Sequence, residues 1–208
     1  MRIKICGLSR AEDIDYVNEA GADYAGLVFA QSRRRVSPAQ AERLRGRLAG
    51  GIVPVGVFAG APPQAVAALY RDGVIAMAQL HGAEDAGYIA RLKEASSAGG
   101  LAPVPVIKAV FAADLERGAG FAAGADFYLA DSGAGSGEAF DWGLLRGLAF
   151  PAPWFLAGGI CAGNAERAMG LGPFAIDVSS GVETGGVKDF GKIMRLAAMA
   201  AAAGGKAL

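Results

Sequence analysis

The sequence predicts an α/β protein that forms a small (β/α)8 TIM barrel, with residues 1–208 as a single domain. Short apolar segments typical of strands alternate with helix-like segments along the whole chain, which favours parallel pairing of the strands. The strand–helix unit repeats eight times, and eight such units close into a barrel. A chain of 208 residues that is 53% hydrophobic can bury the core of such a barrel. The expected strand ends are residues 6, 29, 58, 81, 109, 131, 158 and 179, which lie 21 to 29 residues apart.

An open, doubly wound parallel sheet is the alternative fold for this alternation of strands and helices. Sheets of that kind often bind dinucleotides through a Gly-x-Gly-x-x-Gly turn after the first strand, and no such turn follows the first strand here. Eight consecutive parallel strands also tend to close on themselves. The barrel is therefore the preferred prediction.

The first strand is predicted within residues 2–7, where Ile3 and Ile5 alternate with Lys4 and Cys6. A strand inside a parallel barrel has both faces covered, so Lys4 and Cys6 are expected to share the inner face. Cys6 would lie at the carboxyl end of the strand, which is the edge where barrel enzymes carry their chemistry.

The helices are predicted from their end signals. The first covers residues 10–20 and ends at Gly21, and the second begins at Ser37 and Pro38. The helix at residues 114–123 is interrupted by glycine, so the fifth helix is expected to be weak or irregular. The other expected strands are 24–29, 53–58, 77–81, 104–109, 127–131, 154–158 and 174–179, and the other expected helices begin at residue 62 or cover 83–98 and 189–203.

Composition and charge narrow the choice of partners and compartment. Lys and Arg number 20, as do Asp and Glu, so the formal net charge is zero and argues against a nucleic-acid or membrane-surface partner. The two cysteines, Cys6 and Cys161, do not make a disulfide scaffold. Met1 is followed by a charged strand rather than an apolar signal segment, and no apolar run is long enough to span a membrane. We therefore expect a cytoplasmic protein.

Glycine and serine turns follow the last two expected strands and predict a phosphate site. Gly158 and Gly159 follow the seventh strand, and Ser180 and Gly181 follow the eighth, as in the standard phosphate site of TIM barrels. Glycine lets backbone N–H groups approach phosphate oxygens, and serine hydroxyls add donors. The alternative interpretation of the glycine pair is an ordinary tight turn.

A thiol and a carboxyl group are predicted on opposite sides of the barrel mouth. Cys6 ends the first strand and Asp131 ends the sixth, so that the pair could serve as base and acid. The alternatives are a cysteine that packs as a small apolar side chain and an aspartate that caps the following loop. The sequence has no recognisable set of zinc ligands. Other polar side chains expected at strand ends belong to Gln79, His81, Lys108 and the arginines at 33–35, and His81 is given no catalytic role.

Several segments, in order along the whole chain, give it a family resemblance. The two most specific are Lys-Ile-Cys-Gly at residues 4–7 and Asp-Val-Ser-Ser-Gly-Val-Glu at 177–183. With them the chain resembles the phosphoribosylanthranilate isomerases of tryptophan biosynthesis. The other matching segments are residues 26–29, 32–37, 55–58, 79–82, 107–109, 135–137, 140–142 and 158–159.

The resemblance implies a cofactor-free Amadori rearrangement. N-(5-phosphoribosyl)anthranilate becomes 1-(2-carboxyphenylamino)-1-deoxyribulose 5-phosphate. Asp131 matches the general acid that protonates the ribose ring oxygen, and Cys6 matches the general base that removes the C2 proton. Arg34 matches the arginine expected to hold the anthranilate carboxylate, a bidentate task that suits guanidinium. The resemblance leaves a monomer or a homodimer equally open.

Two further expectations concern the surroundings of these residues. Lys4 and Asp177 are expected on inner faces of adjacent strands, where they would form an ion pair, and Lys4 could raise the thiolate fraction of Cys6. The chain departs from the family in a short loop after Asp131 and in Glu138, where relatives commonly carry a lysine. Arg33 and Arg35 flank Arg34, which leaves open which of the three arginines holds the carboxylate.

Two other classes of protein compete with the isomerase. One comprises other phosphate-binding barrels, such as a sugar-phosphate epimerase or thiamin phosphate synthase. The first of these would need metal-binding histidines and the second an acidic cluster for magnesium, and neither is recognisable here. The other is a ligand-binding barrel without activity, which the presence of both Cys6 and Asp131 disfavours.

Overall fold

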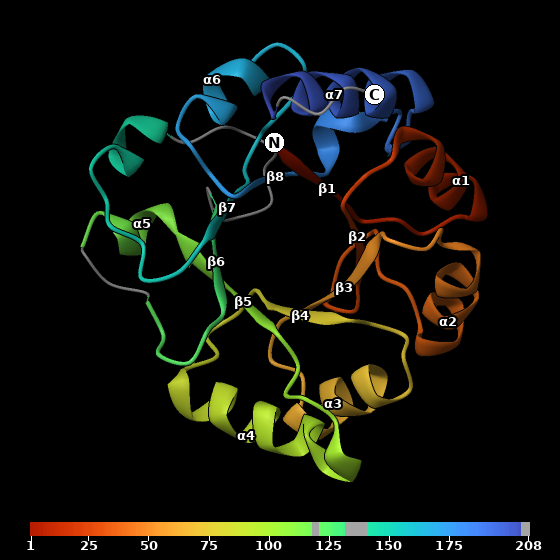
Figure 1. The fold of residues 1–208 in the computed structure, drawn as a ribbon, viewed down its shortest axis with the longest axis vertical. Coiled ribbons are helices and arrows are strands. Elements are labelled where there is room, and N and C mark those ends of the chain that lie inside the picture. The colour runs from red at the N-terminus through yellow and green to blue at the C-terminus, as the bar shows by residue number, and fades with distance from the viewer. Residues whose placement is uncertain (118–120, 132–140, 205–208) are drawn as a thin grey trace.

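The computed structural model describes residues 1–117, 121–131 and 141–204. Its eight parallel strands form a closed barrel in chain order, with the helices outside the ring of strands (Figure 1). The predicted fold class is thereby confirmed. Glu138 and most of the loop after Asp131 fall outside the described residues. The strands are β1 (Arg2–Cys6), β2 (Tyr24–Val28), β3 (Val53–Phe58), β4 (Met77–Leu80), β5 (Val106–Phe111), β6 (Phe127–Asp131), β7 (Trp154–Leu156) and β8 (Ala175–Val178).

The helices follow the expected order but differ in length. The fifth is irregular as predicted, because α5 is a single α-helical turn and the other described residues between β5 and β6 form no further helix. No described helix is both long and apolar enough to cross a lipid bilayer. The α-helices are α1 (Ala11–Ala20), α2 (Pro38–Arg47), α3 (Pro63–Arg71), α4 (Ala86–Ser96), α5 (Ala112–Leu115), α6 (Ala165–Met169) and α7 (Phe190–Ala203), and the 3-10 helices are η1 (Ala98–Gly100), η2 (Trp142–Leu145) and η3 (Ser180–Val182).

The fifth strand lies two residues later than predicted. Two side chains outside the strand explain its starting point. The Val104 amide donates to Ser96 Oγ at 2.9 Å, and the Val106 amide donates to Asp126 Oδ2 at 2.8 Å. Pro105, between them, has no N–H to offer a neighbouring strand. The ladder of β5 therefore begins at Val106 and continues to Phe111.

Aromatic side chains fill the amino-terminal half of the barrel. Phe155 is fully buried, and its ring packs edge-on against Tyr24 and Phe127 at centroid distances of 5.3 and 5.8 Å. Smaller side chains, Cys6, Val28 and Val57, cluster toward the carboxyl ends of the first three strands. This gradient in side-chain size closes one end of the barrel and leaves a hollow at the other.

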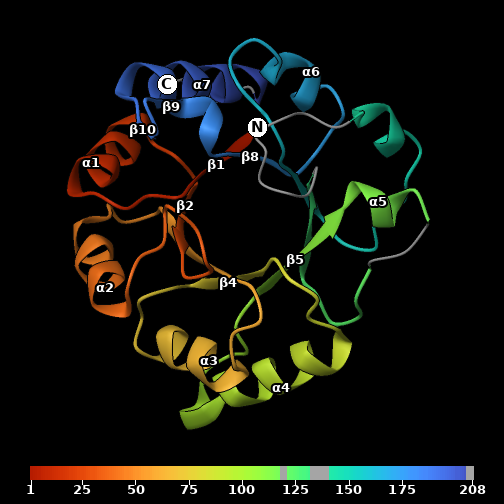
Figure 2. The ribbon, with the colours of Figure 1, turned by 180° about the vertical axis from the view of Figure 1, so that it is seen from behind.

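A two-stranded hairpin follows β8 and connects the barrel to α7. It consists of β9 (Glu183–Thr184) and β10 (Val187–Lys188), and it lies beside α1 and α7 (Figure 2). Arg10, which precedes α1, donates to the Lys188 carbonyl at 3.2 Å, and Lys192 of α7 donates to the Glu183 carbonyl at 2.6 Å. These contacts fix the hairpin next to the barrel mouth.

Candidate active site

A cavity of about 450 Å³ opens at the carboxyl ends of the strands. Its lining includes six of the seven residues that the sequence predicted for the site. The seventh, Gly181, lies behind the lining, where a Cβ atom would overlap the carbonyl oxygen of Ile160. Glycine at this position lets the turn after β8 approach the turn after β7. The six lining residues are Cys6, Arg34, Asp131, Gly158, Gly159 and Ser180.

Two consecutive glycines shape the turn after β7. Gly158 and Gly159 have φ angles of 88° and 64°, which belong to the left-handed region where other residues are strained. Their amides donate no hydrogen bond to any part of the chain that the structure describes. Asn164 holds the turn, because it donates to the Gly159 carbonyl at 2.9 Å. The glycine turn therefore presents N–H groups at the edge of the cavity, as an anion site requires.

Cys6 lies at the end of β1 in a position that depends on a glycine of β2. A Cβ atom at Gly26 would lie 2.7 Å from Cys6 Sγ, so glycine leaves the space that the thiol occupies. Burial raises the pKa of the Cys6 thiol, and the positive charges of Lys4 and Lys188 oppose this only in part. Lys4 thus acts in the expected direction, but burial dominates. The thiol is protonated at neutral pH.

The predicted ion pair between Lys4 and Asp177 is confirmed. Lys4 Nζ lies 2.8 Å from Asp177 Oδ2 inside the barrel, and the lysine is fully buried. Burial by itself would lower the pKa of Lys4, but the charges and hydrogen bonds of Asp177 and Cys6 together outweigh it and raise the pKa. Lys4 is therefore a permanent cation beneath the cavity floor. Lys4 Nζ also donates to Gln79 Oε1 at 2.8 Å.

Gln79 connects this ion pair to His81, a residue for which no catalytic role was predicted. Because Lys4 has only donors, the Gln79 amide must direct its oxygen toward Lys4 and its nitrogen toward His81. Gln79 Nε2 lies 3.2 Å from His81 Nδ1, which places the imidazole proton on Nε2. Burial lowers the pKa of His81, against the opposing charge of Asp131, so the ring is neutral at pH 7. His81 Nε2 lies 3.7 Å from Asp131 Oδ2, beyond hydrogen-bonding distance.

Of the three consecutive arginines, only Arg34 lines the cavity. Its Nε and Nη2 atoms donate to the two oxygens of Glu183 at 2.7 and 2.9 Å. Gly7 makes room for this side chain, since a Cβ atom there would overlap Arg34 Cδ. Arg33 also contacts Glu183, at 2.6 Å, but its side chain is 58% exposed and outside the cavity.

Glu183 was not predicted as part of the site, although it joins the arginine loop to the β9–β10 hairpin. Lys188 Nζ donates to Glu183 Oε1 at 2.8 Å and to the Ser179 carbonyl at 2.9 Å. Burial by itself would raise the pKa of Glu183, but the hydrogen bonds from Arg34 and Lys188 lower it to about 2. Glu183 is therefore a carboxylate at neutral pH and fixes one edge of the Arg34 guanidinium.

The chain that forms this site is similar in sequence to proteins of a known family. Residues 3–198 match the description of the N-(5'phosphoribosyl)anthranilate (PRA) isomerase family. The chain belongs to this family. The isomerase of Endomicrobium trichonymphae is 45% identical over 93% of this chain and 94% of its own length. That of Lacticaseibacillus casei is 43% identical over 92% of this chain and 90% of its own.

Solved structures of isomerases give the same result. The Thermus thermophilus phosphoribosyl anthranilate isomerase superposes with a TM-score of 0.84 at 35% identity, covering 97% of this chain and 99% of that one. A phosphoribosyl anthranilate isomerase in complex with reduced 1-(o-carboxyphenylamino)-1-deoxyribulose 5-phosphate superposes with a TM-score of 0.77 at 30% identity, covering 99% of each chain.

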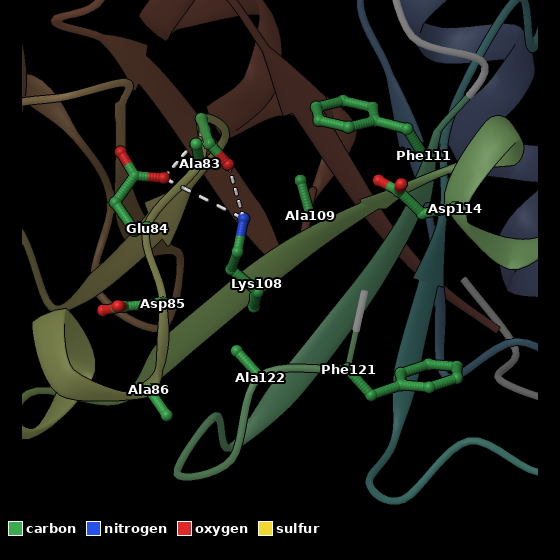
Figure 3. A pocket seen from close by; sticks show the side chains of 11 residues that line it. Ala83, Glu84, Asp85, Ala86, Lys108, Ala109, Phe111, Asp114, Phe121 and Ala122 are labelled. Atoms are coloured by element: carbon green, nitrogen blue, oxygen red, sulfur yellow. Dashed lines mark hydrogen bonds and ion pairs between the residues drawn. The ribbon is translucent and has the colours of Figure 1, made fainter. Parts of the chain in front are cut away.

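One residue expected at the mouth of this isomerase-family barrel points elsewhere. Ile107 and Ala109 face the barrel interior, so Lys108 between them faces outward. It lines a second pocket of about 500 Å³ outside the barrel (Figure 3). Lys108 Nζ donates to the Gly82 carbonyl at 2.7 Å and lies 3.9 Å from Glu84 Oε2. The lysine thus holds the turn that follows His81 and does not reach the cavity.

Among the described residues, no three His, Cys, Asp or Glu side chains are grouped so that they could hold a metal ion. The charged side chains in and below the mouth of this isomerase-family barrel are instead used in protein contacts. Lys4 pairs with Asp177, and Arg34 pairs with Glu183.

Proposed function

We propose that this cavity rearranges N-(5-phosphoribosyl)anthranilate to 1-(2-carboxyphenylamino)-1-deoxyribulose 5-phosphate without a cofactor. The observation that carries the proposal is the convergence of four kinds of group on one cavity. These are the Cys6 thiol, the Asp131 carboxyl group, the Arg34 guanidinium and the glycine turn at Gly158 and Gly159. The substrate has a sugar ring to open, a carboxylate and a phosphate, which correspond to these groups.

The acid lies on β6 and the base on β1, three strands apart in the closed ring, which suits a two-step reaction. Asp131 protonates the ribose ring oxygen, and the ring opens to a protonated Schiff base between C1 and the anthranilate nitrogen. The Cys6 thiolate then removes the proton from C2, and an enolamine forms. Transfer of a proton to C1 and loss of the enol proton give the ketone, so C1 is reduced and C2 is oxidised.

Arg34 keeps an edge for the anthranilate carboxylate although Glu183 occupies the other. A guanidinium has five N–H donors, and the Nε–Nη2 edge uses two of them on Glu183. The Nη1–Nη2 edge can then bind a second carboxylate in a bidentate manner. In this proposal Glu183 is a positioning residue for Arg34.

The activity is tested by following the loss of fluorescence of phosphoribosylanthranilate. We expect first-order loss that depends on enzyme concentration and persists after treatment with a metal chelator. Fluorescence that stays constant, under conditions where a known isomerase consumes the substrate, would contradict the proposal.

We further propose a cytoplasmic enzyme that acts as a monomer or a homodimer on this small phosphorylated substrate, with no nucleic-acid or membrane partner.

The phosphate site gives a first prediction. Crystals soaked in inorganic phosphate should show the anion against the backbone of Gly158, Gly159, Ser180 and Gly181, because these turns offer N–H groups and a hydroxyl. Inorganic phosphate should also raise KM with kcat unchanged. An anion found only at the arginine loop, with inhibition that lowers kcat, would contradict this location of the phosphate site.

Replacing Arg34 by alanine should lower kcat/KM, because the substrate carboxylate loses its bidentate partner. A charge-assisted hydrogen-bond partner of a carboxylate is worth about 1.5–3 kcal/mol, so kcat/KM should fall roughly 10- to 150-fold. Arg33→Ala is the matched control, because Arg33 also contacts Glu183 but lies outside the cavity. If Arg33→Ala loses activity and Arg34→Ala does not, the neighbour holds the carboxylate.

A further inference from the structure

One oxygen of Asp177 has no partner although it is buried at the active-site cavity. Asp177 is 8% exposed and lines the cavity, and its Oδ2 atom binds Lys4. Its Oδ1 atom accepts no hydrogen bond within the part of the chain that the structure describes. Leaving a buried acceptor without a donor costs roughly 1–3 kcal/mol, and more when it is charged. Such an atom in a native structure requires a specific explanation.

The position of Asp177 identifies what approaches it. In the barrel ladder Asp177 is paired with Lys4 of the adjacent strand β1, and Cys6 lies two residues further along β1 on the same face. Asp177 is close enough for its charge to raise the pKa of the Cys6 thiol. The carboxylate oxygen and the proposed base therefore face the same part of the cavity, with the carboxylate one layer deeper.

A substrate bound as proposed would place its sugar carbons next to Asp177. Its phosphate would bind the turns after β7 and β8, and its carboxylate would bind Arg34 in the loop after β2. The sugar carbons between them then pass over β8 and β1, whose side chains lining the cavity include Asp177 and Cys6. Sugar carbons carry hydroxyl groups, which are the donors that a buried carboxylate oxygen needs.

We propose that Asp177 Oδ1 accepts a hydrogen bond from the hydroxyl on C2 of the substrate, the carbon from which Cys6 removes a proton. This inference rests on the proposed function. Holding the C2 hydroxyl beneath the cavity directs the C2 hydrogen toward Cys6 Sγ. The hydroxyl becomes an enol during the reaction, and an enol is a stronger donor, so the bond strengthens as the reaction proceeds. Asp177 thus binds substrate through one oxygen and Lys4 through the other.

The proposal also predicts a specificity for the C2 hydroxyl. A site that hydrogen-bonds a substrate hydroxyl rejects an analogue without it, because the buried acceptor is then left unpaired. Asp177→Asn reverses the polarity of the site with little change in size. Lys4 has only donors, so the asparagine oxygen must face Lys4 and its NH₂ group must face the cavity. The charged acceptor for the C2 hydroxyl becomes a neutral donor, and a hydrogen bond between neutral groups is worth less than one to a carboxylate.

The test compares three ligands in two proteins. The ligands are reduced 1-(o-carboxyphenylamino)-1-deoxyribulose 5-phosphate and its 2-deoxy and 3-deoxy analogues, and the proteins are the wild type and Asp177→Asn. We expect the 2-deoxy analogue to bind at least about tenfold more weakly than the parent in the wild type. In Asp177→Asn the hydroxyl can only accept a weaker bond from a neutral amide, so this affinity ratio should be at least about threefold smaller. The 3-deoxy analogue is the control, and its relative affinity should not change between the proteins. If the 2-deoxy analogue loses the same factor of affinity relative to the parent in both proteins, the proposal is overturned.

A second measurement does not depend on the stability of the variant. In a crystal structure of the wild type with the reduced analogue, the C2 oxygen should lie within 3.2 Å of Asp177 Oδ1. A C2 oxygen that contacts other groups, with Asp177 Oδ1 bound to another donor, would also overturn it. If the wild type neither converts phosphoribosylanthranilate nor binds the reduced analogue, the proposed function itself fails. If it does both but the ratios do not depend on Asp177, only the present inference fails.

Discussion

Replacing Asp131 by asparagine should lower kcat about 10²–10⁴-fold while the barrel remains folded. The sugar ring cannot open until its oxygen receives a proton, and an amide in place of the carboxyl group has no acidic proton to give. Asp131 lies at the end of β6, where the backbone ladder is complete without its side chain. The measurement is turnover of phosphoribosylanthranilate by fluorescence, with circular dichroism to verify folding.

Asp15→Asn is the matched control, because Asp15 is 53% exposed and pairs only with Arg47 on the surface among the described residues. Its turnover should equal that of the wild type. Turnover of Asp131→Asn within threefold of the wild type would instead place the acid elsewhere. His81 would then be the next candidate, since the Nε2 proton inferred from Gln79 faces the same carboxyl group.

Some features of the site could be predicted from the sequence because they depend on the period of a strand. Lys4 and Cys6 share the inner face because side chains alternate along β1. The partner Asp177 follows because β8 must lie beside β1 when the barrel closes. The same parity rule shows why the expectation for Lys108 was wrong. With β5 ending at Phe111, residues 107, 109 and 111 face inward, and Lys108 faces the outer pocket.

Other features could not be predicted because they depend on loops that approach one another only in the folded chain. Glu183 is 149 residues from Arg34 in sequence, and nothing in its local pattern indicates that contact. The role of Gln79 is set by the direction of its amide, which depends on Lys4. The start of β5 is likewise set by the side chains of Ser96 and Asp126 in neighbouring segments. In each case tertiary contacts, rather than local propensity, decide the outcome.

Replacing Cys6 by serine should lower kcat at least about a hundredfold, because the variant removes the base and retains its shape. A serine hydroxyl keeps the size and polarity of the side chain but is a far weaker acid than a thiol, so almost none of it ionises near neutral pH. The measurement is again turnover, together with the affinity for the reduced product analogue, which should change little. Cys161→Ser is the control, since Cys161 does not line the cavity.

The pH dependence separates a chemical role of Cys6 from a packing role. Burial raises the pKa of the Cys6 thiol above its usual value, so the thiolate fraction at pH 7 is small and increases as the pH rises. The wild-type rate should therefore increase with pH through the alkaline range, and Cys6→Ser should lose this increase. Near-native turnover by Cys6→Ser, with the alkaline rise intact, would mean that Cys6 only fills the space left by Gly26. A different group at the barrel mouth would then have to remove the C2 proton.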